Sequence, residues 1–188
     1  MDEIDYELIN KAKNGNKAAL CALIKKTQKI IYATLFYLKK DENDINDIMQ
    51  NVLLKLSNKI SQLKNEKYFK TWLNQIIVNT YYDYMRKNKK YISQLKFEEI
   101  NDNASIQVAD FSTNPQNSIL NNELDFLIKT SIQNLPLHYK IPITLREIQG
   151  LSYDEISSIT NTSVGTVKSR IARARALIKD KLIKYAKE

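Results

Sequence analysis

The segment Leu151–Ile178 places the strongest constraint on the fold, because its polar and apolar residues are spaced as in a helix-turn-helix. Ser152 and Glu155 have the spacing of a capping box, in which the serine caps a backbone N–H and the glutamate reaches back. This box predicts the start of a short helix. Asn161 and Thr162 are expected to form the turn that follows it.

The second helix of this segment has the composition of a helix that lies in a DNA major groove. Its apolar residues share one stripe at helical spacing, and its opposite side carries small polar residues that allow close approach. One long cation on that side, Arg173, can reach base edges, and the marginal cations can hold phosphates. A merely solvated basic helix is the alternative. The residues predicted to contact DNA are Ser163, Thr166, Lys168, Ser169, Arg170, Arg173 and Arg175.

The composition favours a helical protein with one moderate domain or two small ones. The 188 residues include only three glycines and three prolines, and 43% of them are hydrophobic. The single cysteine, Cys21, lies in an apolar run and is expected in the core, and one cysteine excludes an internal disulfide. No apolar run approaches the ~18 residues of a membrane span, and the acidic N-terminus does not resemble a signal peptide. We therefore expect a cytoplasmic protein without direct membrane insertion.

The charge pattern predicts two nucleic-acid contacts separated by an acidic connector. The net charge is +8, yet residues 97–128 contain no lysine or arginine, whereas residues 163–188 hold eight basic residues against two acidic ones. Helical periodicity is lost over 92–118, which indicates a linker. We therefore expect an all-α fold of two small helical domains, 1–91 and 119–188, joined by a flexible acidic linker at 92–118. The acidic residues of the connector are Glu98, Glu99, Asp102, Asp110, Glu123 and Asp125.

Three helices are expected in the N-terminal domain, near Lys17–Leu38, Asp44–Ile60 and Phe69–Lys89. On the second of them, one exposed leucine, Leu54, lies among acidic and amide residues opposite the apolar stripe. An apolar anchor with a polar rim is typical of a protein-contact site, although a stray surface leucine is also common. The residues of this predicted contact are Asp47, Gln50, Asn51 and Leu54.

The third expected helix combines aromatic, amide and basic side chains on one stripe beside its buried side. Aromatic rings offer stacking surfaces, amides read base edges and cations hold the backbone, so the combination favours binding of single-stranded or opening DNA. Trp72 taken alone is more often a core residue, and that alternative remains. Tyr82 and Asp83 share this stripe. The predicted DNA contacts are Lys70, Trp72, Gln75, Asn79, Arg86 and Lys87.

Two ordered blocks of sequence resemble one known family. DINDIMQNVLL (Asp44–Leu54) followed by FKTWLNQIIVNTYYDYMRK (Phe69–Lys87) is similar to the second conserved region of bacterial sigma factors. Leu135–Pro136 and the segment Leu151–Ile178 resemble their fourth region. The absence of a third region between the two blocks is typical of the extracytoplasmic-function (ECF) class of alternative sigma factors.

The resemblance implies a partner for each surface. The face around Asp47 and Leu54 docks on the clamp helices of the RNA polymerase β′ subunit, and the β subunit is a further contact. The loop before Phe69 and the Trp72/Asn79 helix recognise and melt the −10 element of promoter DNA. The helix Ser163–Arg175 reads the −35 element. The linker passes through the polymerase toward the RNA exit path, and an anti-sigma factor is a common regulator of the class.

Three residues depart from the family pattern. Asn51 stands where glutamate is common, which lowers the charge of the polymerase-facing surface. Ser157 replaces a small alanine of the helix-turn-helix. Pro142 falls where a helix usually continues, which predicts a kink or a late helix start.

Two other classes of function compete with a promoter-specificity subunit. A helix-turn-helix regulator with an N-terminal sensing or dimerisation domain would share the C-terminal motif, but it has no need for a DNA-melting stripe. A nucleic-acid enzyme is disfavoured because the only histidine is His138, and neither a glycine-rich phosphate loop nor Cys/His metal spacing is present. We therefore expect no catalytic activity, no cofactor, no metal and no small-molecule substrate.

Overall fold

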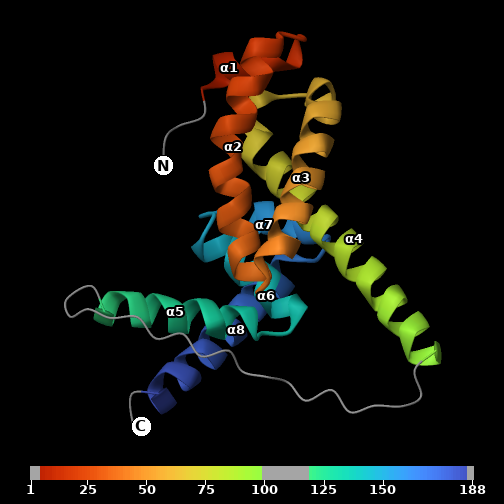
Figure 1. Ribbon diagram of the computed structural model, residues 1–188. Coiled ribbons are helices and arrows are strands. Elements are labelled where there is room, and N and C mark those ends of the chain that lie inside the picture. Colours follow the sequence, from red (N-terminus) through yellow and green to blue (C-terminus); the bar gives the residue numbers. More distant parts are fainter. Residues whose placement is uncertain (1–4, 99–118, 186–188) are drawn as a thin grey trace.

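The computed structural model describes residues 5–98 and 119–185, and within those ranges it is helical without strands (Figure 1). The all-α fold expected from the sequence is confirmed. Two short 3-10 turns, η1 and η2, separate α3 from α4. The elements are α1 (Tyr6–Lys13), α2 (Lys17–Leu38), α3 (Glu42–Lys59), η1 (Ile60–Gln62), η2 (Glu66–Tyr68), α4 (Phe69–Glu98), α5 (Ile119–Gln133), α6 (Leu137–Glu147), α7 (Tyr153–Thr160) and α8 (Val164–Tyr185).

Side-chain caps fix the starts of the N-terminal helices. Asn16 accepts a hydrogen bond from the Ala19 backbone N–H at 2.9 Å, which begins α2. The Asp41 carboxylate accepts two backbone N–H groups at the start of α3. The bounds of α2 and α3 agree with the periodicity of the sequence. α4, by contrast, continues past the end expected near Lys89 to Glu98.

The N-terminal core lies between α1, α2, α3 and α4, and its larger members come from the helix stripes that the sequence predicted. Cys21 does not belong to it. The side chain of Cys21 is exposed on α2, so the expectation of a core cysteine was wrong. The apolar residues around Cys21 suggested burial of the whole run, but α2 buries only one side of it. The buried members of the N-terminal core include Leu23, Ile31, Leu35, Val52, Leu56, Leu73 and Ile77.

Tyr81 fastens α4 to the end of α2. Its side chain is 1% exposed, and its hydroxyl donates to the Leu38 carbonyl at 2.9 Å. That carbonyl belongs to the last turn of α2, where no intrahelical donor remains. Burial raises the pKa of the Tyr81 hydroxyl to about 12. The phenol therefore stays protonated, and able to donate, throughout the neutral range.

Tyr81→Phe should lower the free energy of unfolding by about 1 kcal/mol, because the Leu38 carbonyl loses its donor without a change in ring packing. Thermal melting followed by circular dichroism measures the effect. Tyr68→Phe is the matched control, since Tyr68 is 66% exposed. Equal melting temperatures for Tyr81→Phe and the parent chain would show that the hydrogen bond contributes nothing.

In the C-terminal half, α6 begins at Leu137 and contains Pro142 within its length. Of the two outcomes predicted for Pro142, a kink or a late helix start, the late start is therefore wrong. Proline lacks the N–H that would bond to the His138 carbonyl one turn earlier, so α6 forms without that bond. Pro142 and the residues beside it are buried, and burial of this apolar turn compensates for the missing bond.

Polar side chains of the C-terminal helices join the two halves of the chain. Gln133 at the end of α5 donates to the carbonyls of Phe36 and Lys39 at 2.7 and 2.9 Å. Gln149 after α6 donates to the Thr34 hydroxyl at 2.8 Å. α4 also packs against α7, so the helices of the two halves are in direct contact.

None of the described helices is long and apolar enough to cross a membrane. Most of the predicted linker, residues 99–118, lies outside the described residues, while residues 92–98 form the last turns of α4.

Candidate nucleic-acid and protein interfaces

The helix-turn-helix is built as its capping residues predict. The Ser152 hydroxyl accepts the Glu155 N–H at 3.2 Å, and Glu155 accepts the Ser152 N–H at 2.8 Å, so the capping box is confirmed. Asn161 has a φ of 52°, the left-handed conformation that ends α7. Ser157, one of the departures from the family pattern, donates to the Thr162 carbonyl at 2.5 Å. Its hydroxyl therefore braces the turn between the two helices.

One side of α8 packs into the C-terminal core and leaves the other side free. Val167, Ile171 and Ala174 are buried, as the apolar stripe predicted. The Ser163 hydroxyl accepts the Thr166 N–H at 3.2 Å and caps the helix. On the opposite side the side chains are short except for the arginines and Lys168. Ser163, Lys168, Ser169, Arg173 and Arg175 are exposed, while Thr166 and Arg170 are partly buried.

Several of these side chains already have partners within the chain. Arg175 donates from Nε and Nη2 to one carboxylate oxygen of Glu147 at 3.0 and 2.6 Å, and this pair raises the pKa of Arg175. The Lys168 ammonium lies 5.7 Å from the centre of the Tyr153 ring. Ser169 donates to the Thr166 carbonyl at 2.9 Å. Among the arginines and lysines predicted to contact DNA on α8, Arg173 extends from the centre of the exposed side.

The predicted protein contact on α3 is a continuous exposed face. Asp47, Gln50 and Asn51 are exposed, and Leu54 among them is 62% exposed. The Asn51 amide donates to the Asp47 carbonyl at 2.8 Å, so its side chain lies along the helix. A leucine so exposed among polar groups leaves an apolar surface that a partner protein can cover.

The predicted DNA contacts on α4 lie along one side of the helix. Gln75, Asn79, Arg86 and Lys87 are exposed, and Lys70 is partly buried. Trp72 is also partly buried, with its ring centre 5.9 Å from that of Phe69. Trp72 therefore packs against the core while part of its side chain remains accessible to solvent.

The start of this surface contacts the helix-turn-helix. Thr71 of α4 donates to the Glu155 carboxylate of α7 at 2.6 Å. Glu155 therefore caps its own helix and also bonds to α4. Burial is the largest single influence on the pKa of Glu155 and raises it, but hydrogen bonds from Thr71 and Ser152, with a smaller contribution from the charge of Lys70, together outweigh burial and lower the pKa.

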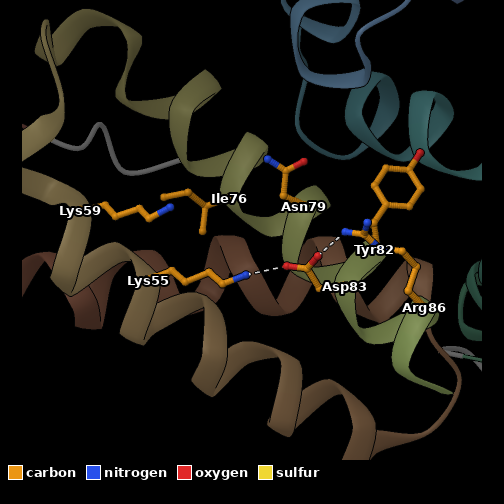
Figure 2. Close-up of a pocket in the computed structure, with 7 residues that line it drawn as sticks. All are labelled: Lys55, Lys59, Ile76, Asn79, Tyr82, Asp83 and Arg86. Atoms are coloured by element: carbon orange, nitrogen blue, oxygen red, sulfur yellow. Dashed lines mark hydrogen bonds and ion pairs between the residues drawn. The ribbon is translucent and has the colours of Figure 1, made fainter. Parts of the chain in front are cut away.

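Sequence reasoning missed a groove between α3 and α4 of about 580 Å³ (Figure 2). Lys55 of α3 and Arg86 of α4 both pair with the carboxylate of Asp83 in this groove. The only signal was the spacing of Lys55 and Lys59 one turn apart on α3, and nothing in the sequence placed them opposite α4. Its lining residues are Lys55, Lys59, Ile76, Asn79, Tyr82, Asp83 and Arg86.

Among the described residues, no group of three or more histidine, cysteine, aspartate or glutamate side chains is placed to hold a metal ion.

The fold and its exposed faces define a helical DNA-binding protein with a helix-turn-helix and a separate amide- and aromatic-lined surface. The family profile for sigma-70 region 2 matches residues 23–91, and that for sigma-70 region 4 matches residues 125–178. The chain is 35% identical to the ECF RNA polymerase sigma-E factor of Haemophilus influenzae, over 95% of each chain. It is 31% identical to the sigma-E factor of Escherichia coli K12, over 95% of this chain and 94% of that one.

The chain belongs to the ECF class of RNA polymerase sigma factors. It is an alternative sigma factor, a subunit that directs RNA polymerase to start transcription at particular promoters.

Two solved structures share the fold at low sequence identity. The CnrH protein in complex with the cytosolic domain of CnrY superposes with a TM-score of 0.67 at 20% identity, covering 97% of this chain and 99% of that one. The sigma factor RpoE of Bartonella quintana, in complex with the anti-sigma factor NepR, superposes with a TM-score of 0.65 at 22% identity, covering 86% and 94%.

Proposed function

We propose that this sigma factor binds core polymerase through α3 and reads a promoter at two elements, with α8 on the −35 element and α4 on the −10 element. The observation that carries the proposal is the exposed side of α8, with Arg173 at its centre and short side chains around it. In this role the chain has no catalytic activity, cofactor or small-molecule substrate of its own. Residues 1–91 and 119–188 act as the two functional domains, joined at 92–118.

The −35 element is read in the major groove by the N-terminal turns of α8. Ser163, Thr166 and Ser169 are short enough for the helix to approach the bases, and Arg173 reaches the base edges. Lys168 and Arg170 hold backbone phosphates, which position the helix but carry little sequence information. Arg175 first has to leave Glu147 to act in the same way, so it is the weaker phosphate contact.

Helix α4 opens the −10 element and holds its unpaired strand. The accessible part of the Trp72 side chain offers a stacking surface for an unpaired base, while the amides of Gln75 and Asn79 offer donors and acceptors for base edges. Lys70, Arg86 and Lys87 hold the backbone.

Polymerase association uses the α3 face. Leu54 supplies the apolar anchor, and Asp47, Gln50 and Asn51 form its polar rim against the β′ clamp helices. The C-terminal domain provides a second contact, with the β subunit.

Binding to a whole promoter requires the two halves to separate. The elements lie about 25 base pairs apart, on the order of 85 Å of B-DNA. In the free chain α4 and α7 are in contact, and Thr71 is hydrogen-bonded to Glu155. Assembly with polymerase therefore breaks this contact and extends the chain.

An anti-sigma factor is the regulatory partner that fits these surfaces. The solved RpoE structure is a complex with an anti-sigma factor. The α3 face and the α4 surface both remain accessible in this chain, and a protein that covered them would block polymerase and DNA together. We place the protein in the cytoplasm, where the polymerase works, with an anti-sigma factor as its means of retention at the membrane.

Two substitutions on α8 test the proposal. Arg173→Ala should weaken binding to the cognate −35 element by about 1–3 kcal/mol and relax the base preference, because one base contact is lost. Lys168→Ala should weaken binding to all sequences alike and reduce the salt slope by about one, because one phosphate contact is lost. Fluorescence anisotropy of holoenzyme on matched and mutated −35 duplexes measures both effects. Unchanged discrimination in Arg173→Ala would remove Arg173 from the readout.

A further inference from the structure

The groove between α3 and α4 is a preformed anion site that the chain fills with its own carboxylate. Asp83 uses one oxygen to accept from the Lys55 ammonium at 2.9 Å and the other to accept from Arg86 Nη2 at 2.5 Å (Figure 2). The two cations come from different helices and converge on one carboxylate. The point where they converge is therefore a position at which the fold stabilises negative charge.

Positive charge in the groove exceeds what Asp83 neutralises. Lys59 also lines it, and no ion pair among the described residues includes Lys59. A second hollow of about 470 Å³ shares Lys55, Asp83 and Arg86 with the first and adds Lys87. Two cations thus pair with Asp83, while Lys59 lines the first hollow and Lys87 the second, and this surplus of positive charge favours a further anion.

The two ion pairs of Asp83 are exposed enough for an external anion to replace its carboxylate. The side chains of Lys55, Asp83 and Arg86 are 37%, 43% and 77% exposed. Ion pairs at this exposure contribute little to folding, so the fold does not depend on keeping them. A phosphate offers the same cations charge-assisted bonds of equal or greater strength.

The remaining lining favours a nucleotide phosphate over other anions. The Asn79 amide is exposed and Tyr82 is half-buried, and both residues belong to the lining of the groove. An amide and a ring next to a phosphate site suit the base and sugar that a strand carries. Both residues share the side of α4 that we assign to the −10 element, so a strand held there continues into the groove.

We propose that the α3–α4 groove binds a backbone phosphate of the unpaired promoter strand, and that Asp83 occupies the phosphate position until the strand arrives. Lys55 and Lys59 are then DNA contacts on the helix otherwise assigned to polymerase. Asp83 is a competitor that lowers the affinity for any strand and pairs with Lys55 and Arg86 in the free groove. The inference rests on the proposed role of α4 at the −10 element.

The test measures binding of holoenzyme, assembled from core polymerase and the full chain, to DNA with a single-stranded −10 region and no −35 element. Asp83→Asn should tighten binding about fivefold, equally for the cognate and a scrambled strand, because a backbone contact is indifferent to sequence. Asp180→Asn is the matched control, because it removes an exposed carboxylate on the distant part of α8. Lys55→Gln and Lys59→Gln should each weaken binding and reduce the salt slope by about 0.7.

A double-mutant cycle separates competition from a general charge effect. The gain from Asp83→Asn should vanish in a chain that already carries Lys55→Gln and Arg86→Gln. Unchanged or weaker binding by Asp83→Asn with an intact melting curve would overturn the proposal. So would a gain that persists in that chain, or a Lys55→Gln variant whose defect lies in core association. A wrong assignment of α4 to the −10 element would give a different result, because the parent holoenzyme would then bind cognate and scrambled strands equally well.

Discussion

Leu54→Glu is expected to abolish association with core RNA polymerase while the chain stays folded. Leu54 is 62% exposed on α3 and surrounded by Asp47, Gln50 and Asn51, so it contributes little to the core. In the complex, however, the substitution places a carboxylate where an apolar anchor is buried, and no cation of the α3 face is available to pair with it. The expected loss of affinity is at least about 100-fold, or about 2.7 kcal/mol, so that no complex is recovered by co-purification.

Co-purification with tagged core polymerase and a titration by fluorescence anisotropy measure that loss. Ile183→Glu provides the matched control, because Ile183 is an exposed aliphatic residue near the end of α8. Circular dichroism melting should be unchanged in both variants. Normal co-purification of Leu54→Glu would show that the polymerase contacts another surface.

Trp72→Ala should allow closed-complex binding but impair promoter opening by about one to two orders of magnitude. Stacking of an unpaired base on an aromatic ring contributes roughly 1–3 kcal/mol per base, and the accessible part of Trp72 is the surface assigned to it. Permanganate reactivity of unpaired thymines reports opening, and protection of the −35 element reports closed-complex binding. Full permanganate reactivity in Trp72→Ala would remove Trp72 from the melting surface.

The packing role of Trp72 needs its own control, because its ring also contacts Phe69. Trp72→Phe retains an aromatic face and much of the packing, so it should retain most of the opening activity. A variant defective only through lost packing would instead show a lowered melting temperature together with weaker binding to both promoter elements.

Local patterns in the sequence predicted the helices and the helix-turn-helix well, because caps and apolar stripes act between near neighbours. Ser152, Glu155 and Asn161 lie where their chemistry placed them, and Leu54 is exposed as its surroundings predicted. The failures at Cys21 and Pro142 have a different origin. An apolar run does not reveal which of its members face solvent, and buried packing can offset the hydrogen bond that a proline removes.

Contacts between segments that are distant in the sequence could not be predicted from its local patterns. Gln133 and Gln149 carried no signal in the sequence that placed them against α2, and the predicted capping box of Glu155 did not reveal its second bond, to Thr71 of α4. The convergence of Lys55 and Arg86 on Asp83 likewise depends on how α3 packs against α4. Such bonds join residues far apart in the chain, so the periodicity of the sequence does not predict them.

Transcription in a purified system shows whether the chain gives core RNA polymerase a promoter specificity of its own. Core RNA polymerase is incubated with genomic DNA fragments, with or without the chain, and the run-off transcripts are sequenced from their 5′ ends. We expect a set of transcripts that appears only when the chain is added, that shares two upstream elements, and that is lost with Leu54→Glu. The same transcripts with and without the chain would contradict this expectation.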